Sequence, residues 1–150
     1  MDGRMTYADE GGLTSRFYRW ANGVDIINAW IDTTSTETGQ VIFEQQQNSV
    51  NDIVVTAGDF YSPDLNVPFN IAVRHGSTFL NGAADGIALT ANTTPVALPD
   101  LSSTDLSLGY DYMGTIKHFR IWAEDIGDDG IVHGSTDIPE VVGLPEIGVY

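Results

Sequence analysis

The acidic and histidine residues of this sequence decide whether it carries hydrolytic chemistry. Glycoside hydrolysis needs two carboxylates that face each other across a cleft, about 5–5.5 or 6.5–9.5 Å apart. Glu44 lies in a strand-like stretch, residues 43–46, that offers no second acid. His75, His118 and His133 are far apart in the sequence, and scattered residues alone do not define a Ser-His-Asp triad. The sequence therefore predicts a protein that is not an enzyme.

Cysteine is absent, which excludes disulfides, thiolate zinc sites and thiol nucleophiles. Hard oxygen donors are plentiful, so calcium is the metal that this composition favours. Residues 125–130, Asp-Ile-Gly-Asp-Asp-Gly, begin like an EF-hand loop, but Gly127 stands where that loop needs Asp or Asn. Thr136 also replaces its closing Glu. The alternative is a turn whose Asp side chains accept hydrogen bonds from backbone amides. No cofactor is predicted, with calcium as the one candidate ligand.

Aromatic and amide side chains could bind carbohydrate, because a flat ring can lie under a sugar while amides and acids bond its hydroxyls. Trp30 alternates with Asn28 and Asp32, so the strand face that these residues share is partly polar and is predicted to line a groove. Residues 110–112, Tyr-Asp-Tyr, are loop-like. The predicted carbohydrate site comprises Trp30, Asn28, Asp32, Tyr110 and Tyr112. The alternative is that these rings pack in the core.

The chain is strongly acidic, with 21 Asp and Glu residues against 6 Lys and Arg residues and a formal net charge of −15 over 150 residues. That charge repels a phosphate backbone, so nucleic acid is not an expected partner. It suits solubility, divalent-cation binding or docking on a basic neighbour. No apolar run approaches the roughly 20 residues of a membrane helix, and the first residues do not resemble a signal peptide, so membrane insertion is not expected.

Short strands separated by turns dominate the pattern, and helical periodicity is scarce. The expected strands are 4–7, 17–20, 24–32, 41–46, 53–56, 69–75, 78–80, 87–90, 106–108 and 114–123. We also expect a turn at Asn81-Gly82 and at most one helical turn over 125–131. Trp122 is predicted to lie in the core, where its replacement by Ala would cost about 3–5 kcal/mol. The pattern predicts an all-β, antiparallel two-sheet β-sandwich of jelly-roll type.

Two stretches carry recurrent motifs. Residues 70–82, Asn-Ile-Ala-Val-Arg-His-Gly-Ser-Thr-Phe-Leu-Asn-Gly, form a strand of the type x-x-Ala-Val, a short turn and a strand that ends in Asn-Gly. Leu106-Ser107-Leu108-Gly109 is followed by residues 114–122, Gly-Thr-Ile-Lys-His-Phe-Arg-Ile-Trp, and by the acidic turn 125–131. Together they resemble the central hairpin and closing strands of laminin-G-like, concanavalin-A-like lectin-type domains, over about a quarter of the chain.

This resemblance implies a concanavalin-like sandwich over residues 1–132. Domains of this family often hold calcium at the rim through loop acids, which makes Asp9, Asp111 and Asp125 the calcium candidates. Hydrolases of the superfamily carry Glu-x-Asp-x-x-Glu on one strand, and its polysaccharide lyases carry a Gln-Ile-His strand. Neither motif is present, although Lys117-His118 lies on a strand that could face the groove. A lyase or hydrolase is therefore the least favoured alternative.

Three further stretches are similar to segments of bacteriophage structural proteins: residues 61–63 (Tyr-Ser-Pro), 98–102 (Leu-Pro-Asp-Leu-Ser) and the acidic turn at Asp125. This similarity implies a non-enzymatic virion protein, such as a head decoration, fibre or tail component, whose sandwich contacts host-surface glycans. The alternative is a stand-alone carbohydrate-binding module or lectin in the extracellular space.

Residues 133–150 are predicted to form an extended C-terminal arm, because prolines and glycines interrupt every periodicity there. The predicted assembly contacts of this arm are Pro139, Leu144, Pro145 and Tyr150. The arm would dock on its own sandwich or on a neighbouring chain. Other virion proteins, or copies of this chain in a homo-oligomer, are the predicted partners.

Overall fold

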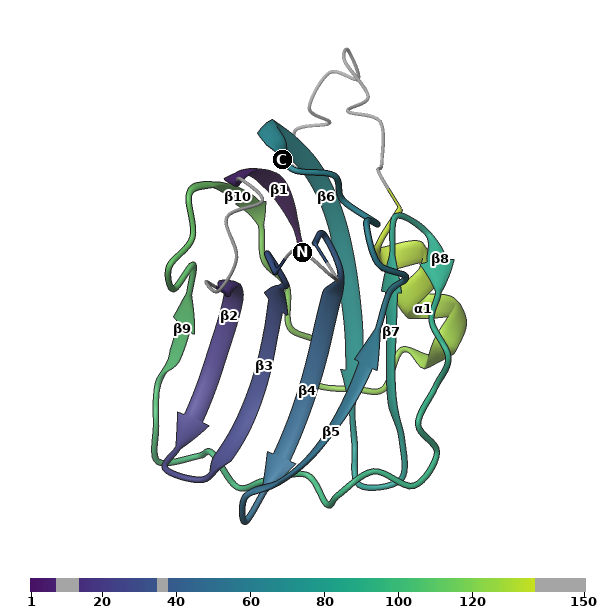
Figure 1. Cartoon of the computed structure of the whole chain (residues 1–150). Coiled ribbons are helices and arrows are strands. Elements are labelled where there is room, and N and C mark those ends of the chain that lie inside the picture. Colours follow the sequence, from purple (N-terminus) through teal and green to yellow (C-terminus); the bar gives the residue numbers. More distant parts are fainter. Residues whose placement is uncertain (8–13, 35–37, 137–150) are drawn as a thin grey trace, which may run out of the picture.

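The computed structural model describes residues 1–7, 14–34 and 38–136, which form two five-stranded antiparallel sheets around a shared core (Figure 1). The sheet orders are β10-β1-β6-β7-β8 and β5-β4-β3-β2-β9. The elements are β1 (Asp2–Tyr7), β2 (Ser15–Asn22), β3 (Asp25–Ile31), β4 (Val41–Gln47), β5 (Val50–Val55), β6 (Asp64–His75), β7 (Leu80–Ala84), β8 (Ile87–Ala88), β9 (Leu106–Leu108), β10 (Gly114–His118) and α1 (Gly127–Gly134). The predicted all-β two-sheet sandwich is confirmed. No helix in these residues is long and apolar enough to cross a membrane.

Alternating side chains along the central strands build the core between the sheets. In β4, Val41, Phe43 and Gln45 are fully buried, as the alternation in the sequence predicts. Across the sandwich, Phe69 of β6 is buried in the same core, and its ring lies 4.7 Å from that of Phe17 in β2. Large aromatic side chains therefore join the two sheets.

The turn predicted at Asn81-Gly82 is wrong, because both residues lie inside β7. A Cβ on Gly82 would lie 2.6 Å from the ring of Phe43 in the opposite sheet, so glycine is needed here for close packing of the sheets. Asn81 is 4% exposed, and its amide donates to α1 rather than shaping a turn. The turn stands instead at Asp85-Gly86, where φ angles of 47° and 77° match the two-residue hairpin that Asp-Gly favours.

The helix α1 is longer than the single turn predicted over 125–131. Its Ile131 is fully buried in a cluster with Ala72 and Ala83, on the face of β6 and β7 that points away from the main core. Arg74 of β6 holds the start of the helix, because its Nε and Nη2 donate to Asp125 at 2.6 Å. These contacts stabilise a glycine-rich helix that has little helical propensity of its own.

The predicted division of the chain after residue 132 falls within α1. Residues 133–136 also contact the sandwich, since Ser135 is fully buried and its hydroxyl accepts a hydrogen bond from Gly86 N at 3.2 Å. The predicted arm contacts are Pro139, Leu144, Pro145 and Tyr150. All four lie outside the described residues, so the assembly arm stays a prediction.

Trp122 is not a core residue, contrary to the prediction, because its side chain is 44% exposed. The strand β10 ends at His118, which pairs with Asp2 at the first position of β1. Because β1 begins at Asp2, residues after His118 have no partner on β1, and the chain leaves the sheet. Residues 119–126 then cross toward α1 without regular structure (Figure 1).

We expect Trp122→Ala to lower the free energy of unfolding by about 1–2 kcal/mol, because the ring is only partly removed from water. A fully buried Trp or Phe would cost about 3–5 kcal/mol on the same change. Urea unfolding at pH 7, followed by circular dichroism, measures the difference. A loss within the larger range would show that Trp122 belongs to the core after all.

Candidate functional site

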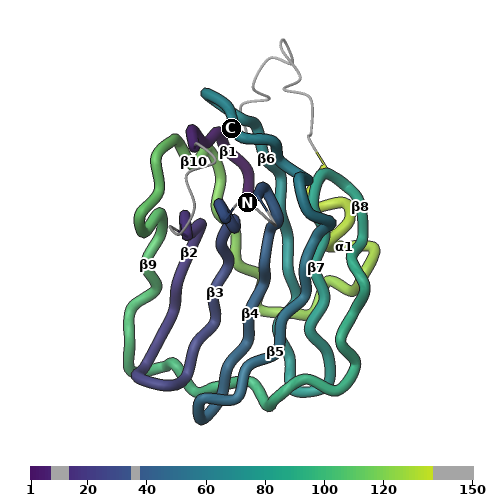
Figure 2. Tube along the Cα trace, viewed as in Figure 1, coloured from purple at the N-terminus to yellow at the C-terminus, as the bar shows by residue number. Residues whose placement is uncertain are grey.

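The outward face of the sheet β5-β4-β3-β2-β9 carries an aromatic residue among polar side chains. On β3, Asn28 and Trp30 point away from the core, since Ala29 and Ile31 are fully buried on the other face. The strands β2, β3 and β4 lie side by side (Figure 2). Their register extends these two positions into rows across the three strands. One row is Arg16, Trp30 and Ile42, the other is Arg19, Asn28 and Glu44, and the six residues are called the Trp30 face below.

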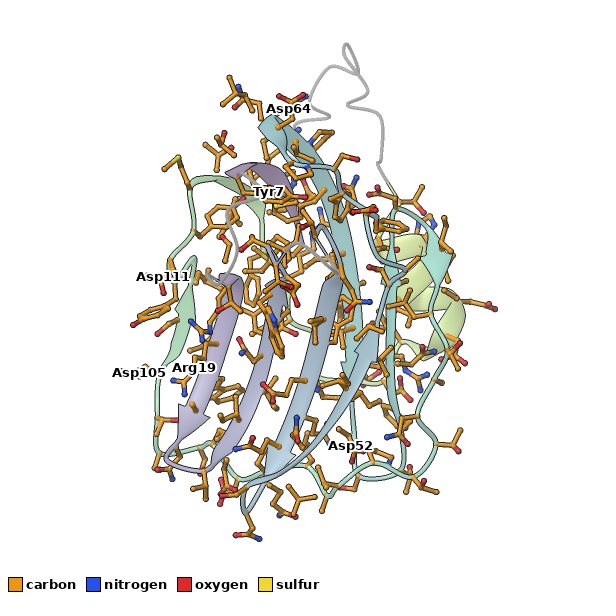
Figure 3. The ribbon with its side chains drawn as sticks, viewed as in Figure 1. Tyr7, Arg19, Asp52, Asp64, Asp105 and Asp111 are labelled. Carbon is orange, nitrogen blue, oxygen red and sulfur yellow. The ribbon has the colours of Figure 1, made fainter. Side chains whose placement is uncertain are left out.

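A β-bulge in β2 places both arginines on this face. The register between β2 and β3 shifts between Arg16 and Tyr18, so Phe17 is an extra residue in the ladder. In a regular strand, residues three apart point to opposite faces. Here Phe17 and Tyr18 both point into the core, and Arg16 and Arg19 both point outward. In Figure 3, Arg19 lies on β2, toward the edge of the sandwich that also carries Asp105 and Asp111.

Two buried polar atoms of the Trp30 face have no hydrogen-bond partner in the part of the chain that the structure describes. They are Nε of Arg16 and Oδ1 of Asn28. Asn28 is only 5% exposed, because its short side chain lies among longer ones. A buried polar atom without a partner costs about 1–3 kcal/mol. Both atoms are covered by neighbouring side chains, so a ligand on this face reaches them only if those side chains move.

The predicted sugar-binding residue Tyr110 lies next to the Trp30 face. Its ring is 55% exposed, and the guanidinium carbon of Arg16 lies 5.3 Å from the ring centre. The backbone N–H of Arg16 donates to the Tyr110 carbonyl at 3.0 Å, and Asp111 Oδ2 lies 3.6 Å from Arg16 Nη1. The structure thus brings Trp30 and Tyr110 together beside Arg16, with Asn28 in the next row beside Arg19.

The other two predicted sugar-binding residues form contacts within the fold. Tyr112 packs in the core, with its ring 6.1 Å from Phe17 and 6.3 Å from Phe69, and its hydroxyl donates to the Arg4 carbonyl at 2.8 Å. Burial raises the pKa of Tyr112. Asp32 lies just beyond β3, where its Oδ1 accepts from Thr34 N at 2.7 Å and shapes a turn. Tyr112 is therefore not available as a ligand on the Trp30 face, and one carboxylate oxygen of Asp32 is engaged within the chain.

The two calcium candidates that the structure describes, Asp111 and Asp125, do not lie in one site. Both carboxylate oxygens of Asp125 accept from Arg74, and this hydrogen bonding lowers the pKa of Asp125 below its ordinary value. Asp111 pairs with Arg16 at the opposite side of the sandwich. Asp9 lies outside the described residues. Over residues 1–7, 14–34 and 38–136, no three side chains of Asp, Glu or His are placed to hold a metal ion.

A buried chain of hydrogen bonds links the two sheets behind the Trp30 face. Gln45 Nε2 donates to the carbonyls of Gly76 at 2.9 Å and Val96 at 2.6 Å, which leaves its Oε1 to accept from His75 Nδ1 at 3.3 Å. His75 Nε2 then accepts from the Tyr18 hydroxyl at 3.3 Å. Burial lowers the pKa of His75 from 6.5 to about 4, so the imidazole is neutral at pH 7. Burial also raises the pKa of Tyr18.

The sequence did not point to Arg16, Arg19 or Glu44 as partners of Trp30. Alternation assigns Arg16 and Arg19 to opposite faces of a regular strand, and only the bulge brings them together. Glu44 lies beside Asn28 because β3 pairs with β4 in a particular register, and alternation along the sequence does not specify that register. The adjacent inward-facing aromatics Phe17 and Tyr18 were the one signal of a bulge in the sequence.

Comparison of this chain with models of protein families, with curated proteins and with solved structures finds no match.

Proposed function

We propose that this protein is a non-enzymatic β-sandwich that binds carbohydrate through the Trp30 face, as a structural component on the surface of a bacteriophage particle. The observation that carries the binding role is the outward sheet face on which the partly exposed Trp30 lies among Arg16, Arg19, Asn28 and Glu44. An aromatic ring among fixed donors and acceptors suits a ligand that has both apolar faces and hydroxyl groups.

The polar side chains of this face have free bonding capacity. The Arg19 side chain is partly exposed and forms no ion pair or hydrogen bond within the described residues. A guanidinium fork can bond two neighbouring oxygen atoms at once, such as adjacent sugar hydroxyls or a uronic acid carboxylate. Glu44 accepts from Asn51 Nδ2 at 3.3 Å and keeps a second carboxylate oxygen for a sugar hydroxyl.

The virion setting rests on the similarity of residues 61–63, 98–102 and the acidic turn at Asp125 to bacteriophage structural proteins. A net charge of −15 would keep particles soluble and apart. Immunogold electron microscopy of particles from the source tests it: regular label on heads, fibres or tails is expected. Antigen found only free in solution would favour a stand-alone extracellular lectin.

We expect Trp30→Ala to weaken glycan binding by roughly 30-fold, the loss of about 2 kcal/mol that a central aromatic contact contributes. The measurement is binding to an array of neutral and acidic bacterial surface glycans, followed by titration calorimetry with the best ligand. Arg19→Ala should weaken the same ligand, because it removes the guanidinium beside Asn28.

Trp122→Ala is the matched control, because it also removes a partly exposed tryptophan but lies on the inner side of β3, away from the outward face that carries Trp30. Binding should be unchanged in this variant. Equal affinity of wild type, Trp30→Ala and Arg19→Ala for every bound glycan would contradict the proposed site, and no binding by wild type would contradict the function.

A further inference from the structure

The two sheets do not cover each other completely. On β6, residues up to Ile71 pair with β1 or with Met1, but β1 begins at Asp2. Beyond Ile71, β6 continues to His75 with β7 on one side and no strand on the other within the described residues. Residues 119–126 pass across this gap instead (Figure 1).

A cleft of about 420 Å³ lies between this segment and the inner face of the opposite sheet. Its walls are mostly aromatic and aliphatic: Tyr18, Trp20, Ile27, Val73, Leu106 and Phe119. Ile27, Val73, Leu106 and Phe119 belong to the core, yet they are only partly buried. The cleft is what leaves these inward-facing side chains uncovered.

The cleft is open to solvent on one side, and its walls are mostly apolar. Water gains little against apolar walls, so an apolar ligand suits this space. A cavity of roughly 150 Å³ with such walls takes one benzene ring, so about 420 Å³ accommodates two or three rings. This volume lies within the range of ligand sites in proteins.

The polar groups of the cleft determine which hydrogen-bonding groups and which charge the ligand carries. The Tyr18 proton is directed to His75 Nε2, so Oη of Tyr18 retains only acceptor capacity. Trp20 Nε1 already donates to the Thr104 carbonyl at 3.0 Å. Arg74 is occupied by Asp125 and by Asp128. Arg120 and Glu124 also line the cleft, but both are exposed to solvent. The Met1 ammonium, a further lining group, donates to the Ile71 carbonyl at 2.7 Å. Among the buried side chains of the walls, the Tyr18 hydroxyl is therefore the open acceptor, and none carries an unpaired charge.

We propose that this cleft is a second binding site, specific for a small, uncharged, two- or three-ring aromatic molecule that carries a hydroxyl group. The rings lie between Trp20 and Phe119, and the hydroxyl donates to Oη of Tyr18. This site lies on the inner side of β2 and β3 and is independent of the Trp30 face on their outer side.

Titration calorimetry of the full chain with 2-naphthol, and with 2-methoxynaphthalene as the analogue without a donor, tests the proposal. Wild type should bind both and prefer 2-naphthol by about 5-fold, the contribution of one hydrogen bond. Tyr18→Phe should bind both probes equally. Leu106→Trp fills the cleft and should weaken 2-naphthol by about 10-fold or more.

Leu108→Trp is the matched control, since Leu108 lies on the same strand but does not line the cleft. It should bind 2-naphthol as wild type does. No binding of either probe to wild type, equal affinity of wild type and Leu106→Trp, or a preference for 2-naphthol that persists in Tyr18→Phe would each overturn the proposal.

Discussion

Phe17→Ala is expected to lower the free energy of unfolding by about 3–5 kcal/mol, the largest effect of any single truncation proposed for this protein. Phe17 is fully buried at the bulge in β2. Its ring contacts Phe69 and Tyr112 of the opposite side of the sandwich, at 4.7 and 6.1 Å between ring centres. Truncation removes these contacts and leaves a cavity that the rigid sheets on either side cannot close.

Urea unfolding at pH 7 measures this loss, and Phe79→Ala provides the matched control. Phe79 is only partly buried, and its ring packs on the Arg74 guanidinium at 4.2 Å. We expect its truncation to cost about 1 kcal/mol. A Phe17→Ala loss as small as that of Phe79→Ala would mean that the bulge does not anchor the core.

The same bulge connects stability to the candidate site. An extra inward residue at position 17 is what turns Arg16 to the same side as Arg19. A regular strand would place only one of the two arginines beside Trp30. Bulges occur often beside functional sites, where they redirect a side chain.

Strand alternation made much of this fold predictable. Val41, Phe43 and Gln45 alternate with polar or outward residues because one face of β4 is buried, and that burial is visible in the sequence. The end of β10 was not predictable, because the strand pattern continues to Trp122 after its partner β1 has ended. Strand length here depends on a distant segment and not on local preference. The helix α1 likewise depends on Arg74 and on the pocket for Ile131.

The candidate site was predictable only in part. Asn28 and Trp30 lie on one outward face because they are two residues apart in a strand. Tyr110 and Tyr112 look equivalent in the sequence, yet one is exposed beside Arg16 and the other is packed on Phe17. Loop residues follow no period, so only the packing of the closed sandwich separates their roles.

The neutral imidazole of His75 makes stability depend on pH. Its pKa is lowered by burial to about 4 in the folded protein, against 6.5 in the unfolded chain. Between these values the unfolded chain binds a proton that the folded protein does not, so acid favours unfolding. The contribution is fully present above about pH 6.5 and is lost as the pH falls toward 4. The neighbouring groups, Tyr18 and Gln45, offer the imidazolium no compensating negative charge.

We therefore expect the free energy of unfolding to fall by about 2–3 kcal/mol between pH 7 and pH 4.5 through His75 alone, since each pKa unit corresponds to about 1.4 kcal/mol. The measurement is urea unfolding across this range for wild type and His75→Gln. Protonation of carboxylates with a lowered pKa, such as Asp125, also lowers the free energy of unfolding in acid. This loss is the same in wild type and in His75→Gln. The difference between the two pH profiles isolates the imidazole.

His133→Gln is the control for this comparison, because His133 is exposed in the last turn of α1. Its pH profile should follow that of wild type. The His75→Gln profile should be flatter from pH 6.5 downward, even though the variant starts from lower stability at pH 7 through its altered bonds to Gln45 and Tyr18. Parallel profiles for wild type and His75→Gln would contradict a neutral, buried His75. They would imply that water or a carboxylate reaches the imidazole and that the hydrogen-bond chain from Gln45 to Tyr18 is open to solvent.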